Sequence, residues 1–226
     1  MVAYGPIPQP PRYHDFADQR MFLGVPNAFD VLSNLAFAIV GLWGLRAPRG
    51  GGRSPGYLLF VAAVLATAVG SSYYHWAPDN ARLFWDRVPI ALAAAGLLAG
   101  AYAETHTMRR PVALTLALSA FGVASVVWWS VTDRMGVGDL RPYLLIQLAP
   151  ILLIPLWQAI ARSAPRDRIF FGIAAVLYVL AKVAELADRQ IFEALGVMSG
   201  HTLKHLLAAV ASAVLVANIV EKSRRK

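Results

Sequence analysis

VALTLALSAFGVASVVWWSV, residues 112–131, is a run of twenty residues without a single charge. A helix needs about 20 mostly apolar residues to cross the hydrocarbon core of a bilayer. In lipid the backbone must satisfy its own hydrogen bonds, so a spanning segment is either a helix or a strand of a closed barrel. Because the run is long and does not alternate between apolar and polar residues, it predicts a membrane-spanning helix.

Six other segments are also long and mostly apolar, and the whole composition agrees with them. Hydrophobic residues make up 58% of the 226 positions and charged residues only 15%, whereas soluble domains carry roughly 25% charged residues. The sequence therefore predicts an all-α fold, a seven-transmembrane helix bundle that occupies residues 1–226 as a single domain. The expected spans are Asn27–Leu45, Gly56–His75, a short Asp86–Tyr102, Val112–Val131, Arg141–Ile160, Ile169–Ala187 and Thr202–Val220.

The charges are distributed unequally between the two faces that these spans define. The connectors after spans one, three and five, together with the C-terminal tail, hold twelve basic and three acidic residues, whereas the other face holds nine basic and ten acidic residues. The positive-inside rule then predicts an N-terminus outside, with residues 1–26 as an extracytoplasmic segment, and residues 221–226 as a basic cytoplasmic tail. Because orientation and anionic lipid headgroups account for the net charge of +8, nucleic acid is not an expected partner.

Two further features bear on location and chemistry. The chain has no cysteine, which excludes disulfides, thiolate metal ligands and cysteine nucleophiles. The proline-rich start has no basic n-region followed by an apolar core, so it does not resemble a cleaved signal peptide. The Ala- and Arg-rich composition predicts a multi-pass protein of the bacterial inner (plasma) membrane.

Ionisable residues inside spans are costly and indicate function by default. His75 closes the second span, Asp86 opens the third, and His201 and His205 open the seventh. The predicted topology places all four at the same depth, in the outer half of the membrane.

The two later histidines are four residues apart, a spacing that places both on one face of a helix. Two imidazoles at this spacing can bind one metal ion. With His75 as the third ligand and a water in the fourth position, the set describes a catalytic zinc site, since zinc lowers the pKa of bound water to about 7. Ser71, one turn before His75, is the candidate oxyanion donor, with Ser72 as a competitor, and Asp86 is the candidate proton acceptor. The alternative is that the histidines only form hydrogen bonds at the membrane interface.

Three blocks of sequence resemble the alkaline ceramidase family, within the superfamily that includes the adiponectin and progestin receptors. The blocks are Asn27-Ala28-Phe29-Asp30-Val31-Leu32-Ser33-Asn34, then Gly70-Ser71-Ser72-Tyr73-Tyr74-His75 with Asp86 eleven residues later, and Ser199-Gly200-His201-Thr202-Leu203-Lys204-His205. The resemblance covers all seven spans in order, but between the blocks it is only a likeness of hydropathy.

This resemblance implies an intramembrane zinc site on His75, His201 and His205, with Ser71 and Asp86 as the assisting pair. It implies hydrolysis of the amide of ceramide or a related N-acyl lipid that enters from the bilayer. The sequence departs from the family where Arg87-Val88-Pro89-Ile90 replaces Glu-x-Pro-Met, and where Lys204 replaces a tryptophan. These departures put the substrate in doubt.

The resemblance also raises the question of calcium, which eukaryotic members bind near the N-terminus. Asp15 and Asp18 are the candidate calcium ligands here, but Asn27 stands where the family has a later glutamate. Zinc is therefore the expected cofactor, and calcium is the less favoured second metal.

Two other functions remain open from the sequence. One is a receptor-like or lipid-binding seven-span protein with a structural zinc site, which a closed chamber would favour. The other is a transporter, for which Pro150 and Pro155 in the fifth span are the only hints of broken helices. Lys182 and Glu185, which interrupt the sixth span, are expected to neutralise each other.

Overall fold

The computed structural model describes residues 5–46 and 54–225. These residues form helices and turns, without a β-sheet. The helices are α1 (Ala28–Leu32), α2 (Leu35–Arg46), α3 (Pro55–Trp76), α4 (Asn80–Thr105), α5 (Pro111–Arg134), α6 (Arg141–Ile160), α7 (Pro165–Leu186), α8 (Asp188–Leu195) and α9 (Gly200–Arg225). The first four residues of the predicted N-terminal segment lie outside the described residues, as do Arg49, Arg53 and Lys226 of the predicted charge pattern.

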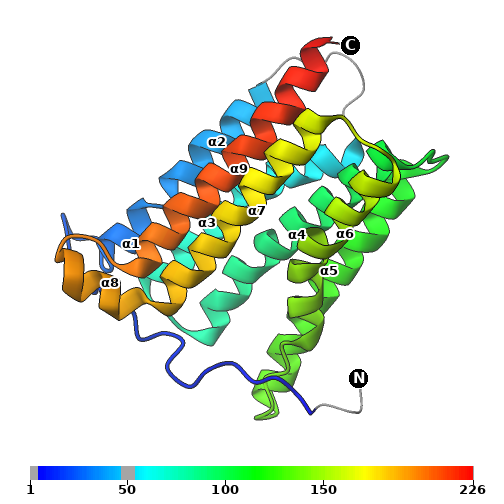
Figure 1. The fold of residues 1–226 in the computed structure, drawn as a ribbon. Helices are drawn as coiled ribbons and strands as arrows, with labels where there is room; N and C mark the ends of the chain where they lie inside the picture. The colour runs from blue at the N-terminus through cyan, green and yellow to red at the C-terminus, as the bar shows by residue number, and fades with distance from the viewer. Residues whose placement is uncertain (1–4, 47–53, 226) are drawn as a thin grey trace.

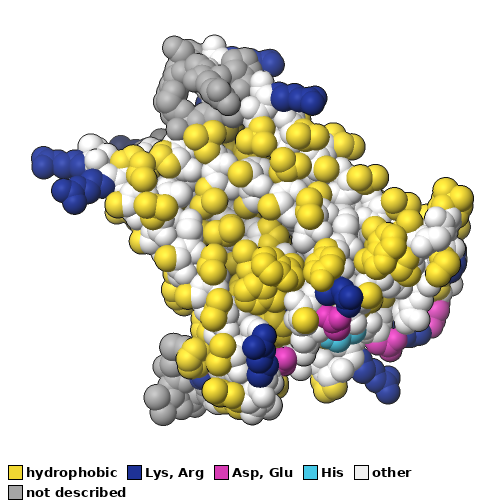
Figure 2. Space-filling model, turned by 180° about the vertical axis from the view of Figure 1, so that it is seen from behind, with side chains coloured by type: hydrophobic (Ala, Val, Ile, Leu, Met, Phe, Trp, Pro, Cys, Tyr) yellow, Lys and Arg dark blue, Asp and Glu magenta, His cyan; other side chains and the backbone are white. Residues whose placement is uncertain are grey.

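Seven segments are long and apolar enough to cross a membrane, with α1 and α2 together forming the first of them. This confirms the all-α, seven-helix bundle. Figure 1 shows α9 lying between α2 and α7, and α4, α5 and α6 forming the other side of the bundle. Apolar side chains cover the middle of the surface in Figure 2, as expected for a protein surrounded by lipid.

Two elements differ from the predicted spans. Helix α4 begins six residues before the expected Asp86, because the Asp79 carboxylate caps it by accepting a hydrogen bond from the Arg82 backbone N–H at 2.7 Å. Its first turns carry charged residues, so hydropathy alone places the start too late. Helix α8 was not predicted; it has eight residues, none of them buried, and is too short to span a bilayer.

Small residues bring α3 and α4 into close contact. A Cβ atom added to Gly70 would lie 2.2 Å from the carbonyl oxygen of Trp85, and one added to Gly56 would lie 2.3 Å from the backbone nitrogen of Gly100. Small residues at helix interfaces let backbones approach in this way. The contact at Gly70 matters for the site, because it places the end of α3 against the first turns of α4.

Ion pairs join α4, α7 and α9 at the opposite end of the bundle. Lys222 contacts both Glu104 and Asp167 at 2.9 Å, and Arg166 pairs with Glu221. These three acids are the ones expected on the cytoplasmic face, and each has a basic partner from that same face. The pairs agree with a common side for these connectors, while the orientation in the membrane stays a prediction.

Candidate metal centre

The three predicted metal ligands meet at one end of the bundle, where α3 ends and α9 begins. His75 lies in the last turn of α3, and His201 and His205 lie in the first two turns of α9. All three side chains are buried, and their ligand atoms lie within 4.8 Å of one another. The Nε2 atoms of His75 and His201 are 3.2 Å apart. Within the described residues this is the one group of three His, Cys, Asp or Glu side chains that could hold a metal ion.

A hydrogen bond from Ser33, the residue that follows α1, sets the protonation of His205. The Ser33 hydroxyl donates its single proton to the Asp30 carbonyl at 3.0 Å, and its oxygen lies 2.8 Å from Nδ1 of His205. With its proton committed, Ser33 can only accept here, so Nδ1 of His205 carries the hydrogen. The lone pair then remains on Nε2, which is how neighbouring groups prepare histidine for a metal.

Two aspartates fix the start of α9, which carries the other ligands. The His201 backbone N–H donates to Asp188 at 2.7 Å, and the Thr202 hydroxyl donates to Asp30 at 2.6 Å. Gly200 allows this approach, since a Cβ there would lie 2.1 Å from the Ala184 carbonyl. Asp188 also accepts from the Ala17 backbone N–H at 2.8 Å, which holds the N-terminal segment across the site.

These residues fit a zinc ion. Zinc–nitrogen bonds of 2.0–2.1 Å in a tetrahedron put ligand nitrogens about 3.4 Å apart, close to the 3.2 Å between His75 and His201. One contact must give way when a metal binds. The Lys204 ammonium lies 2.8 Å from Nε2 of His201, and a nitrogen with one lone pair cannot accept that proton and bind a metal together.

Ser71 and Asp86 face a cavity beside the histidines. Both are buried, and both line the cavity together with His205. Asp86 Oδ1 has no hydrogen-bond partner among the described residues, so it is available to accept a proton. Ser72, the competing serine, instead donates to the Val31 carbonyl at 3.2 Å. Of the two serines, it is therefore Ser71 that lines the cavity.

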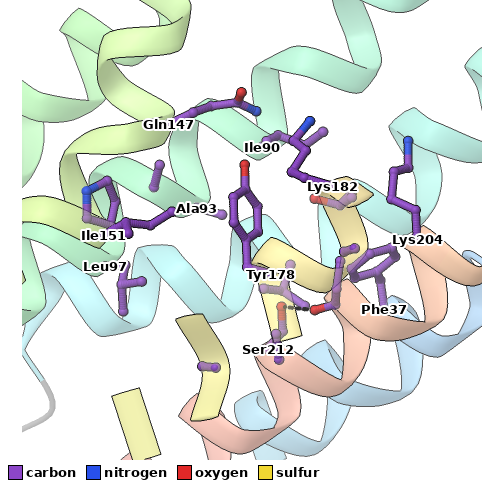
Figure 3. A pocket seen from close by; sticks show the side chains of 18 of the residues that line it. Phe37, Ile90, Ala93, Leu97, Gln147, Ile151, Tyr178, Lys182, Lys204 and Ser212 are labelled. Carbon is purple, nitrogen blue, oxygen red and sulfur yellow. Dashed lines mark hydrogen bonds between the residues drawn. The ribbon is translucent and has the colours of Figure 1, made fainter. Parts of the chain in front are cut away.

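The cavity has a volume of about 310 Å³. Figure 3 shows Lys182 and Lys204 on one side of it and Leu97 and Ile151 on the other. Most of the lining is apolar, and Lys204, one of its charged members, lies 2.8 Å from Nε2 of His201. This combination suits a ligand with a long apolar part and a polar reacting group.

The chain matches no protein-family model and no curated protein sequence. Its likeness to the alkaline ceramidases therefore rests on the three sequence blocks.

The predicted pairing of Lys182 with Glu185 is present, at 2.7 Å, and it includes a third member. Lys204 contacts the other oxygen of Glu185 at 3.1 Å. All three side chains line the cavity, so this cluster adds a net positive charge beside the histidines. The link to Lys204 could not be found from the sequence, because it joins two helices.

The two candidate calcium ligands each pair with an arginine. Asp18 forms an ion pair with Arg20 at 2.7 Å, and Asp15 lies 3.4 Å from Arg189. Burial raises the pKa of the Asp18 carboxyl, but the hydrogen bonds and the charge of Arg20 outweigh it, so the pKa is lowered from its usual value. Neither aspartate belongs to a group of metal-ligating side chains in the described part of the chain.

The sequence did not identify Ser33, Asp30 or Asp188 as parts of the site. Ser33 and Asp30 lie in the block that resembles the family's first span, which was the available signal for them. Asp188 follows Lys182 and Glu185 at a spacing of three residues, and this charged pattern at the end of the sixth span was the available signal for it.

Proposed function

We propose that the chain is a zinc-dependent intramembrane amidohydrolase that cleaves the amide bond of ceramide or a related N-acyl lipid. The observation that carries this proposal is the convergence of three buried histidines with Ser71 and Asp86 at the polar end of an otherwise apolar cavity. The likeness of the three sequence blocks to the alkaline ceramidases supports the same reaction.

Each residue has a task in this reaction. A zinc ion held by the three imidazoles would supply a Lewis acid and a water activated near neutral pH. Ser71 donates its hydroxyl proton to the carbonyl oxygen of the amide, where negative charge develops. Asp86 accepts the proton of the water through its unpartnered Oδ1 and returns it to the nitrogen as the carbon–nitrogen bond breaks. The products are a fatty acid and a free amine.

The surroundings suit a lipid substrate. The apolar part of the cavity holds hydrocarbon chains, which cannot leave the bilayer for water. The substrate therefore has to enter sideways from the membrane, with its amide reaching the polar end beside Ser71 and Asp86.

A lipid-binding or receptor-like protein with a structural zinc is the alternative. Structural zinc sites are usually closed by four protein ligands, whereas catalytic sites keep one position open. The described residues bring only three such side chains together, and the cavity adjoins them. Both points favour catalysis.

Metal content and turnover test the proposal separately. Detergent-purified wild type is expected to hold about one zinc per chain by elemental analysis. His205→Ala is expected to lose it, and His106→Ala, at the far end of α4, is the matched control. Asp86→Asn is expected to retain zinc and lose the release of fatty acid from N-acyl lipids. No zinc in the wild type after reconstitution would remove the mechanism, and full turnover by Asp86→Asn would remove the assignment of Asp86.

A further inference from the structure

Arg87 lines the cavity, and two of its side-chain nitrogens lack hydrogen-bond acceptors among the described residues. Only 3% of its surface is exposed. Its Nη2 donates to the Gln9 side chain at 2.8 Å, but Nε and Nη1 are buried without a partner among the described residues. The guanidinium carbon lies 3.9 Å from the centre of the Trp129 ring, with Tyr143 and Tyr13 slightly farther away.

Burying the Arg87 guanidinium in this way costs free energy unless an anion accepts its remaining hydrogen bonds. A buried charge is tolerated when it is paired and hydrogen-bonded, and the only side-chain hydrogen bond of Arg87 in the described residues goes to a neutral amide. The aromatic faces stabilise a cation, but they leave its N–H groups without acceptors. Arginine is the residue best suited to a carboxylate, because its planar donors meet both oxygens.

The net charge of the cavity lining also favours an anionic ligand. Its charged lining residues are Asp86, Arg87, Lys182, Glu185 and Lys204. Three are basic and two are acidic, so the lining carries a net charge of +1 before any metal adds to it. A neutral lipid headgroup would leave this charge uncompensated, whereas an anionic one would match it.

The position of Arg87 indicates where on the substrate the anion lies. Arg87 follows Asp86 in the chain, and both line the cavity. In the proposed reaction Asp86 returns the proton to the amide nitrogen. In an N-acyl amino acid the carboxylate is separated from that nitrogen by a single carbon atom. Because both side chains line one cavity, they would contact neighbouring groups of the substrate.

We propose that Arg87 binds a carboxylate on the amine half of the substrate, and that the preferred lipids are N-acyl amino acids. This inference rests on the proposed function for the identity of the reacting bond. The acyl chain occupies the apolar part of the cavity near Leu97 and Ile151 (Figure 3). Arg87 is thus a specificity-determining residue, at a position where the sequence departs from the ceramidase pattern.

The test measures binding in protein stripped of metal by a chelator, so that no hydrolysis is needed. N-lauroylglycine and its neutral amide, N-lauroylglycinamide, are titrated into detergent-solubilised protein by calorimetry. Wild type is expected to bind the carboxylate roughly 10- to 100-fold more tightly, as for a hydrogen-bonded buried charge. Arg87→Gln is expected to lose this preference while its affinity for the amide persists. Arg82→Gln, on the same helix but paired with Asp79, is expected to retain it.

Equal binding of the two ligands by wild type would overturn the inference, as would an unchanged preference in Arg87→Gln. If that variant bound neither ligand, Arg87→Met, which keeps an apolar stem between the rings, would be measured and is expected to show the same selective loss. A carboxylate preference without any zinc-dependent hydrolysis would support the Arg87 site and refute the proposed reaction. Hydrolysis of neutral N-acyl lipids without the preference would do the reverse.

Discussion

Replacing Ser33 with alanine tests whether the histidine cluster is prepared for a metal. The Ser33 oxygen is the acceptor 2.8 Å from Nδ1 of His205. Without it, the proton on that nitrogen loses its partner in a site where His205 is only 3% exposed. The imidazole can then move the proton to Nε2, the nitrogen that faces the other ligands, and metal binding must displace it.

The expected cost follows from the one hydrogen bond that is lost. Removing such a supporting partner usually lowers metal affinity by about 10- to 100-fold, which corresponds to roughly 1.4–2.7 kcal/mol. This agrees with the roughly 1–3 kcal/mol that a buried polar group costs when it is left without its partner. Ser33→Ala is therefore expected to bind zinc 10- to 100-fold more weakly while keeping its helical content.

Competition with a chromophoric zinc chelator, in detergent and at fixed pH, measures this difference directly. Ser72→Ala is the matched control, because that hydroxyl is also near the site but donates to the Val31 carbonyl. Unchanged zinc affinity in Ser33→Ala would refute the argument about the His205 proton. An equal loss in Ser72→Ala would show that the effect is general loosening of the helices.

Three other substitutions probe packing, electrostatics and the lysine beside the cluster. Gly70→Ala places a methyl group 2.2 Å from the Trp85 carbonyl, so it is expected to lower the melting temperature and the turnover together. Asp18→Asn removes a carboxyl whose pKa is lowered in the folded state by Arg20 despite its burial. The stabilisation is present above the unfolded pKa of about 3.9 and is lost as the pH falls, so the two proteins are expected to differ at neutral pH and to converge in acid. Lys204→Met removes a cation 2.8 Å from a ligand nitrogen, so zinc is expected to bind more tightly, by about tenfold.

Each of these has a control or a contradicting result. Gly172→Ala, where a Cβ would meet no atom within 4 Å, should leave the melting temperature unchanged. A stability difference between wild type and Asp18→Asn that grows in acid would have the wrong sign. Weaker zinc binding by Lys204→Met would mean that the lysine supports the site and does not compete with the metal.

The seven helices and their order were predictable because lipid imposes one simple requirement on every span. The start of α4 was not, since Arg82, Asp86 and Arg87 make its first turns too polar for a hydropathy argument. The cap at Asp79 was the overlooked signal, because a helix can begin outside the hydrocarbon and carry charges into a buried interface. Helix α8 was not predicted for a different reason. It is short and buries none of its side chains, so neither a minimum length nor an apolar face distinguishes it in the sequence.

The site shows the same division between what a sequence specifies and what packing decides. Depth along a span follows from counting residues, so His75, His201 and His205 could be brought to one level of the membrane without any structure. The rotation of each helix and its closest neighbour decide everything finer than depth. Ser71 and Ser72 are adjacent in the sequence, yet one lines the cavity and the other bonds to α1.

Buried charges at the cavity differ in whether the chain supplies a partner for them. A charge within a membrane protein needs a partner, and Glu185, which lines the cavity, has two lysines. Among the described residues the side-chain hydrogen bond of Arg87 goes to the neutral amide of Gln9, and its guanidinium lies against the Trp129 ring. Glu185 is thus paired within the chain, whereas the Nε and Nη1 donors of Arg87 have no acceptor among the described residues. Because Arg87 lines the cavity, an anionic ligand bound there can supply that acceptor.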